Sequence, residues 1–117
     1  MLSSNNRLNK TKDFDLVFKK GRSIFSKNIG VKVLKNSFKI NRFGVIVGVK
    51  VSKLAVERNL IKKRLRTILR QENKKLLEGY DIVLIVLPEL KNLKYQEIEK
   101  MLNNIFKKHR LYQKNKQ

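Results

Sequence analysis

The segment from Ala55 to Arg70, AVERNLIKKRLRTILR, limits the possible folds more than any other part of this chain. At about 100° per residue it forms a helix with an apolar seam on one side. The seam consists of Ile61, Leu65, Ile68 and Leu69. The helical pattern continues to Glu78, and Gly79 stops it. Such a helix is stable only when another apolar surface covers its seam, so the rest of the chain must supply that surface.

Apolar runs on both sides of this helix have the pattern of β-strands. Arg42 to Val51 alternates, with Phe43, Val45, Val47, Val49 and Val51 on one face. Asp81 to Leu87 is apolar on both faces, as expected of a central strand. Gly30 to Lys35 also alternates, and a further short strand is possible near Ser23 to Ile29. These strands predict a small sheet beneath the helix.

Two further amphipathic helices complete a single α+β domain over residues 1–117. Thr11 to Lys20 carries Phe14, Val17 and Phe18 on one face, and Lys94 to Lys108 has apolar residues at helical spacing. We expect the ends, residues 1–6 and 113–117, to be disordered. If the strands before and after the long helix are parallel, the general chirality rule predicts a right-handed crossover.

The long helix also carries a separate basic stripe beside its apolar seam. The stripe consists of Arg58, Asn59, Lys62, Lys63, Arg66 and Arg70. Its like charges repel one another, and Glu57 is the only acidic residue between Ala55 and Arg70. Most charged helix faces are simply solvated, and that alternative remains open. Cations at this spacing also suit the successive phosphates of a nucleic acid, to which Asn59 would add a hydrogen-bonding amide.

The overall charge favours the nucleic-acid interpretation. The chain has 29 Lys and Arg against 9 Asp and Glu, a formal net charge of +20. A polyanion would neutralise this charge, and in the cytoplasm the usual polyanion is nucleic acid. Charge alone does not separate RNA from DNA. We expect a cytoplasmic protein, because no apolar run is long enough for a membrane span and the N-terminus lacks the pattern of a signal peptide.

No residue pattern indicates that the chain itself performs catalysis or binds a metal. The absence of cysteine excludes Cys-ligated zinc and iron–sulfur clusters, and one histidine cannot form a multi-histidine site. No paired carboxylates or Ser/His/Asp set stands out. We expect His109, in the basic run Lys107 to Arg110, to be a surface residue of the C-terminal tail.

Several short motifs in order resemble those of the protein subunit of bacterial ribonuclease P. They are Asn6-Arg7-Leu8, Asp13-Phe14, Val17-Phe18, Lys20-Gly21, Val47-Gly48, Val51-Ser52-Lys53, Ala55-Val56, Arg58-Asn59, Ile61-Lys62-Lys63, Arg66, Arg70, Tyr95, Phe106 and Leu111-Tyr112. The chain departs from the family pattern in having Leu60 at the third position of the Arg-Asn-Arg motif. It also has a shorter loop between Lys53 and Ala55, and Lys32 where the family often has an aromatic residue.

The resemblance implies a fold like domain 2 of ribosomal protein S5, with three helices, a mixed four-stranded sheet and a left-handed βαβ crossover. Because the two expectations conflict, we expect the left-handed crossover that the resemblance implies and not the right-handed crossover of the general chirality rule. The basic stripe would then bind the catalytic ribonuclease P RNA. A cleft beside the first helix would take the 5′ leader of precursor tRNA through Arg7, Phe14, Phe18, Lys32, Lys50 and Lys53. The resemblance also implies that the RNA subunit, with Mg²⁺, performs the hydrolysis. The protein would need no cofactor, stable protein partner or membrane.

The residues alone leave alternatives open. Aromatic residues at i and i+4, such as Phe14 and Phe18, are more often core residues than base-stacking residues. A ribosomal or general structured-RNA-binding protein would share the size and charge of this chain. So would a protein that compacts DNA without sequence specificity.

Overall fold

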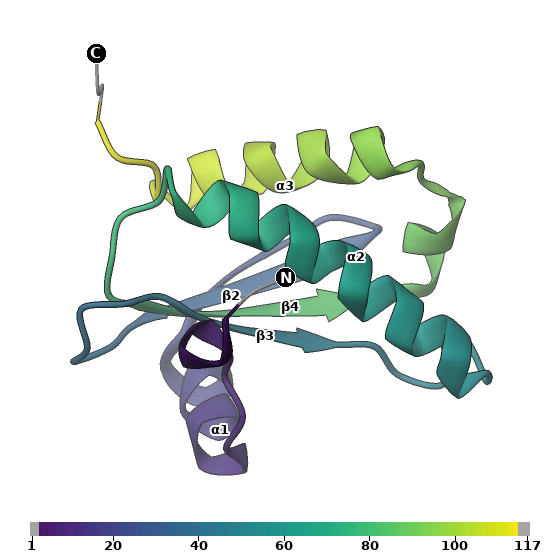
Figure 1. The fold of residues 1–117 in the computed structure, drawn as a ribbon, viewed down its shortest axis with the longest axis horizontal. Helices are drawn as coiled ribbons and strands as arrows, with labels where there is room; N and C mark the ends of the chain where they lie inside the picture. The colour runs from purple at the N-terminus through teal and green to yellow at the C-terminus, as the bar shows by residue number, and fades with distance from the viewer. Residues whose placement is uncertain (1–2, 115–117) are drawn as a thin grey trace.

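The computed structural model describes residues 3–114. The helices and strands follow the predicted order, with α1 at Thr11–Lys20, β1 at Arg22–Phe25, β2 at Ile29–Lys35, β3 at Arg42–Ile46, α2 at Ala55–Asn73, β4 at Tyr80–Val86 and α3 at Tyr95–Lys108. Two short 3₁₀ helices, η1 at Ser4–Asn6 and η2 at Pro88–Asn92, join them. Figure 1 shows α2 and α3 on one face of the sheet and α1 on the other.

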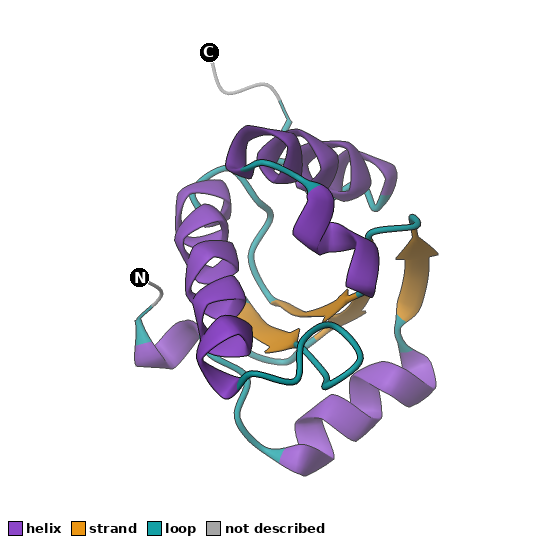
Figure 2. Cartoon of the chain, turned by 90° about the vertical axis from the view of Figure 1, so that its right-hand side faces the viewer, coloured by secondary structure: helices purple, strands orange, loops and turns teal. Residues whose placement is uncertain are grey.

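The strands form one mixed sheet in the order β1-β2-β4-β3. Strand β4 is central, as predicted, and pairs antiparallel with β2 and parallel with β3. The connection from β3 through α2 to β4 is therefore a parallel crossover, and Figures 1 and 2 together show that it is left-handed. The expected fold class, with three helices and a mixed four-stranded sheet, is confirmed.

The composition of the two sheet faces explains why the general right-handed rule is wrong here. Phe43 of β3 and Ile82 and Leu84 of β4 point toward α2 and α3 and belong to the main core. The opposite face is mixed: it carries Lys32 and Asp81 together with apolar residues such as Val83 and Ile85. A right-handed connection would place α2 on that mixed face, where the charged side chains of Lys32 and Asp81 would lie beneath its apolar seam.

The apolar seam of α2 is buried as predicted. Leu65, Ile68 and Leu69 are fully buried, and Ile61 is nearly so. They pack with residues of β2, β3, β4 and α3 in one large core. A second, smaller core lies under α1, where Leu8, Val17 and Val83 are buried together. Helix α1 covers only part of its sheet face.

The strand expected at Arg42 to Val51 ends earlier, at Ile46. Its partner β4 ends at Val86, shortly before Pro88, which has no N–H to donate to a ladder. The chain instead turns, with the Val51 N–H donating to the Gly48 carbonyl at 3.1 Å. The side chain of Val49 is consequently 65% exposed.

Helix α2 ends at Asn73 and not at Glu78. The following residues pair with the C-terminal segment: the Leu77 N–H donates to the Leu111 carbonyl at 2.6 Å, and the Gln113 N–H donates to the Lys75 carbonyl at 2.9 Å. These long-range hydrogen bonds replace the last turn of helix that local sequence favours. Gly79, with a φ of 93°, supplies the left-handed backbone just before β4.

His109 is not a surface residue, contrary to expectation. It is 1% exposed, and its ring Nε2 lies 3.0 Å from the Val31 carbonyl oxygen of β2. Burial lowers the pKa of His109, and the nearby charge of Arg22 acts in the same direction. The C-terminal basic run therefore closes over the sheet at this point.

The structure describes residues 3–6 and 113–114 of the two ends that we expected to be disordered. Ser4–Asn6 forms η1, and the Asn6 side-chain amide donates to the Asn41 carbonyl at 2.7 Å. The side-chain amide of Gln113 donates to the Leu76 carbonyl at 3.0 Å. Residues 1–2 and 115–117 lie outside the described residues.

Candidate nucleic-acid interface

The basic stripe lies along one exposed flank of α2. Asn59, Lys63 and Arg70 are exposed, while Arg58, Lys62 and Arg66 are half-buried. The ion pairs among residues 3–114 join Arg42 to Asp13 and Asp81, Lys75 to Glu72, and Lys91 to Glu57. No cation of the stripe takes part in any of them. Its charge is therefore left for an external anion.

The acidic residue nearest the stripe in sequence faces away from it. A carboxylate oxygen of Glu57 lies 3.3 Å from the Lys91 ammonium, on the side of α2 toward η2. A hydrogen bond from the Ser52 side chain and the contact with Lys91 lower the pKa of Glu57. The Glu57 carboxylate is therefore paired with Lys91 and not with a cation of the stripe.

Arg58 also has a structural contact. One of its terminal nitrogens, Nη1, donates to the Ser52 carbonyl at 2.9 Å, which ties the start of α2 to the preceding loop. Within that loop the Leu54 N–H donates to the Ser52 hydroxyl at 3.2 Å. Arg58 therefore fixes the beginning of the stripe as well as contributing charge to it.

Arg7 lies on the α2 side of the sheet and not with the residues predicted for the leader cleft. It forms a parallel bridge with Phe43 at the free edge of β3, where the Leu8 N–H donates to the Phe43 carbonyl at 2.8 Å. Neighbouring residues of an extended chain point to opposite faces. Leu8 packs beneath α1, and the charge of Arg7 acts on Arg66 of α2.

The face of the sheet that carries α1 brings together Phe18 and Lys32, as predicted. The side chain of Phe18 is 39% exposed, and the Lys32 ammonium lies 5.8 Å from the centre of its ring. Phe14 is half-buried and occupies the space above Gly44, where a Cβ atom would collide with its ring. The space beside Gly44 is therefore filled by Phe14.

Phe25 belongs to this face but was missed in the sequence. Its side chain is 53% exposed and lies over Gly30, its direct partner in the antiparallel β1–β2 pair. In the sequence Phe25 follows the apolar Ile24, so no alternation of polar and apolar residues singles out its face. A four-residue strand is too short for its periodicity to identify the exposed face.

Lys50 and Lys53 do not project from the sheet. Both are exposed on the loop between β3 and α2, because β3 ends before reaching them. The last residue of β3, Ile46, packs with the residues beneath α1. Lys50 and Lys53 thus lie beyond the end of β3 and not beside Lys32.

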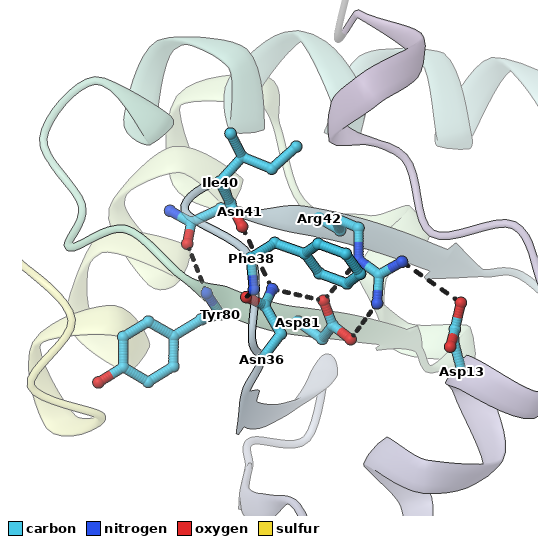
Figure 3. A network of polar contacts seen from close by, with 8 residues as sticks. All are labelled: Asp13, Asn36, Phe38, Ile40, Asn41, Arg42, Tyr80 and Asp81. Atoms are coloured by element: carbon cyan, nitrogen blue, oxygen red, sulfur yellow. Dashed lines mark hydrogen bonds and ion pairs between the residues drawn. The ribbon is translucent and has the colours of Figure 1, made fainter.

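A polar network fixes α1 against the sheet, as Figure 3 shows. Arg42 donates to both carboxylate oxygens of Asp81, at 2.9 and 2.7 Å, and to Asp13 of α1 at 3.3 Å. These contacts, the hydrogen bond to Asp81 foremost, raise the pKa of Arg42. The Arg42 guanidinium also lies 4.6 Å from the ring centre of Phe38. The beginning of α1 is thus anchored near Asp13, while Phe18 lies near its other end.

Asn41 links this region to the end of α2. Its side-chain amide donates to the Asn73 side chain at 2.9 Å and to the Leu77 carbonyl at 2.8 Å, and its oxygen accepts from the Tyr80 N–H at 2.8 Å. A buried asparagine with all these partners holds the β2–β3 loop to the start of β4. Its role was not visible in the sequence, because the partners are remote along the chain.

These features define a small basic α+β protein with an uncompensated cationic helix on one side of its sheet and exposed aromatic residues on the other. In the described residues, no helix has the length and apolar character needed to cross a membrane. Such a pair of surfaces is typical of an RNA-binding protein.

Sequence and structure comparisons identify the family. The profile of the family described as Ribonuclease P matches residues 2–110, and the chain belongs to this family. The Ribonuclease P protein component of Alkaliphilus metalliredigens is 34% identical over 110 residues, covering 94% of this chain and 98% of the relative. That of Natranaerobius thermophilus is 38% identical over 108 residues, covering 92% of this chain and 93% of the relative.

Solved structures of RNase P proteins superpose on this chain. The RNase P protein of Staphylococcus aureus superposes with a TM-score of 0.84 at 27% identity, covering 92% of this chain and 98% of that one. The protein from Thermotoga maritima gives 0.78 at 30% identity, covering 87% and 96%. The resemblance noted in the sequence is confirmed, and neither the ribosomal nor the DNA-compacting alternative is favoured.

Proposed function

We propose that this chain is the protein subunit of ribonuclease P, which assists the removal of the 5′ leader from precursor tRNA in the cytoplasm. The observation that carries the proposal is the unpaired basic stripe of α2, in a chain that belongs to the ribonuclease P family. The stripe would bind the backbone of the RNA subunit. Phosphate contacts of this kind fix the position of a protein on RNA without reading its sequence.

The leader of precursor tRNA would bind on the α1 side of the sheet. Phe18 and Phe25 offer exposed rings on which unpaired bases can stack, a contact worth about 1–3 kcal/mol per base. Lys32 lies beside Phe18 and would contact the adjoining phosphate. Lys50 and Lys53, exposed beyond the end of β3, would extend this positive surface, and Phe14 would support it from beneath.

In this proposal the chain contributes binding and not the chemical step. The RNA subunit with Mg²⁺ would activate the attacking water. The protein would neutralise repulsion between the two RNAs and hold the leader, so less Mg²⁺ would be needed. Mature tRNA has no leader, so the α1 side would favour precursor over product.

A reconstitution at low Mg²⁺ tests this function. Purified protein is added to ribonuclease P RNA and a precursor tRNA, at a Mg²⁺ concentration where the RNA alone is inactive. We expect leader removal only with the protein present. Polylysine at equal positive charge is the control, since it neutralises phosphates but has no leader-binding surface. Tight RNA binding without stimulation, or equal stimulation by polylysine, would contradict the proposal.

A further inference from the structure

Arg7 and Arg66 form a like-charged pair without a counter-ion between the N-terminal segment and α2. Both side chains are half-buried, and neither makes an ion pair with any residue from 3 to 114. The Nε of Arg7 is buried and has no hydrogen-bond partner among these residues. Burial and the charge of Arg7 together lower the pKa of Arg66.

This arrangement is unfavourable in the protein alone. Removing a charged donor from water without giving it an acceptor costs free energy, and a second cation nearby adds repulsion. Half-buried Arg42, by contrast, has two carboxylate partners. An acceptor from outside the chain would relieve both costs at Arg7 and Arg66.

We propose that Arg7 and Arg66 together bind one backbone phosphate of the RNA subunit, at the junction of the N-terminal segment, the free edge of β3 and α2. Guanidinium groups match the oxygens of a phosphate in planar, charge-assisted hydrogen bonds. A small rotation of the Arg7 side chain would give its Nε–H the missing acceptor. The inference rests on the proposed function, and it moves Arg7 from the leader surface to the surface that binds the RNA subunit.

The position of Arg7 indicates which RNA supplies the phosphate, the RNA subunit or the precursor tRNA. Leu8 packs beneath α1, so Arg7 points to the other face, away from Phe18 and Lys32. Arg66 belongs to the basic stripe of α2, and the sheet separates α2 from α1 (Figures 1 and 2). A phosphate held by both arginines therefore belongs to the RNA that binds α2.

The first experiment compares three single substitutions that each remove one positive charge: Arg7→Met, Arg66→Met and the control Lys10→Met. Lys10 is exposed in the same N-terminal segment as Arg7. We expect the two arginine variants to bind ribonuclease P RNA at least about tenfold more weakly. The slope of log affinity against log salt should fall by about 0.7–0.9 for each lost phosphate contact. The control should change much less.

The double arginine variant tests whether the two side chains act together. Its loss of affinity for ribonuclease P RNA should be smaller than the product of the two single losses, because both side chains hold one phosphate.

The second experiment needs no RNA. In a chloride buffer, Arg7→Met should raise the melting temperature of the protein, because methionine keeps the apolar stem and removes the unpaired charge. Inorganic phosphate at constant ionic strength should raise the melting temperature of the wild type more than that of either arginine variant. Lys10→Met should respond like the wild type.

The outcomes separate this site from the proposed function. If the wild type fails to bind ribonuclease P RNA but the phosphate effect depends on Arg7 and Arg66, the site stands and the proposed function does not. If Arg7→Met lowers the preference for precursor over mature tRNA and leaves RNA-subunit affinity unchanged, Arg7 acts in the leader surface and the inference is overturned. Equal losses in Arg7→Met and Lys10→Met would also overturn it, since they would reflect net charge alone.

Discussion

At the scale of single residues, His109 makes the stability of the fold depend on pH. It is the only histidine in the chain, and burial lowers its pKa below the usual value of about 6.5. As the pH falls through that value, the unfolded chain takes up a proton before the folded protein does. The free energy of unfolding should therefore decrease below about pH 6.5 and level off below the folded pKa.

Urea unfolding of the wild type and of His109→Gln between pH 7.5 and pH 5 measures this effect. Glutamine can still donate a hydrogen bond to the Val31 carbonyl but does not titrate in this range. The wild type should lose up to about 1.4 kcal/mol per pH unit more than the variant. Parallel curves for the two proteins would show that His109 does not contribute.

Phe18 and Phe14 give a matched pair for the leader surface. Phe18 is substantially exposed, so Phe18→Ala should cost little stability but weaken precursor tRNA binding by about 1–3 kcal/mol relative to mature tRNA. Phe14 fills the space above Gly44, so Phe14→Ala should mainly lower the melting temperature. Affinities of the reconstituted enzyme for both tRNA forms provide the measurement. An unchanged preference for precursor in Phe18→Ala would remove Phe18 from the leader surface.

At the scale of elements, the exposed cations of α2 test whether the stripe is more than a solvated face. Lys63→Ala with Arg70→Ala should weaken binding to ribonuclease P RNA and lower the salt slope by up to about two units, with little change in stability. These residues are cleaner probes than Arg58, which also holds the loop at Ser52. The matched control is Lys100→Ala with Lys108→Ala on α3. Equal effects in the two pairs would show that the stripe has no special role.

The attachment of α1 to the sheet depends on two carboxylates of different burial. Asp81 is buried and accepts two hydrogen bonds from Arg42, whereas the side chain of Asp13 is 20% exposed. Asp81→Asn should cost about 3 kcal/mol in unfolding free energy, and Asp13→Asn about 1 kcal/mol or less. Chemical denaturation of both variants measures the difference. Equal costs would mean that the contact with α1 matters as much as the contact within the sheet.

At the scale of the whole molecule, local pattern predicted the elements and long-range contacts determined their limits. The seam of Ile61, Leu65, Ile68 and Leu69 follows from helical periodicity, and the central position of β4 follows from a continuous apolar run. Both are properties of neighbouring residues. The early ends of β3 and α2 could not be predicted. They depend on Pro88 and on the C-terminal segment at Leu111, which are distant in sequence.

The same distinction holds for the candidate site. The basic stripe was visible because all its residues lie on one helix, and Phe18 and Lys32 meet as predicted. The side of the sheet that Arg7 faces, the exposure of Phe25 and the burial of His109 depend on strand pairing and on closure of the C-terminal segment. Net charge indicated the type of partner, but only the fold separates the two surfaces.

The bridge between the N-terminal segment and β3 makes residues 7 and 8 a mechanical link between those surfaces. Arg7 and Leu8 are adjacent in the chain, yet one points toward α2 and the other packs beneath α1. A ligand that holds Arg7 therefore also restrains Leu8, and with it the small core on which α1 rests. Binding of the RNA subunit on the α2 side of the sheet would then rigidify the α1 side before precursor tRNA binds. Part of the entropic cost of binding precursor tRNA would therefore already have been incurred.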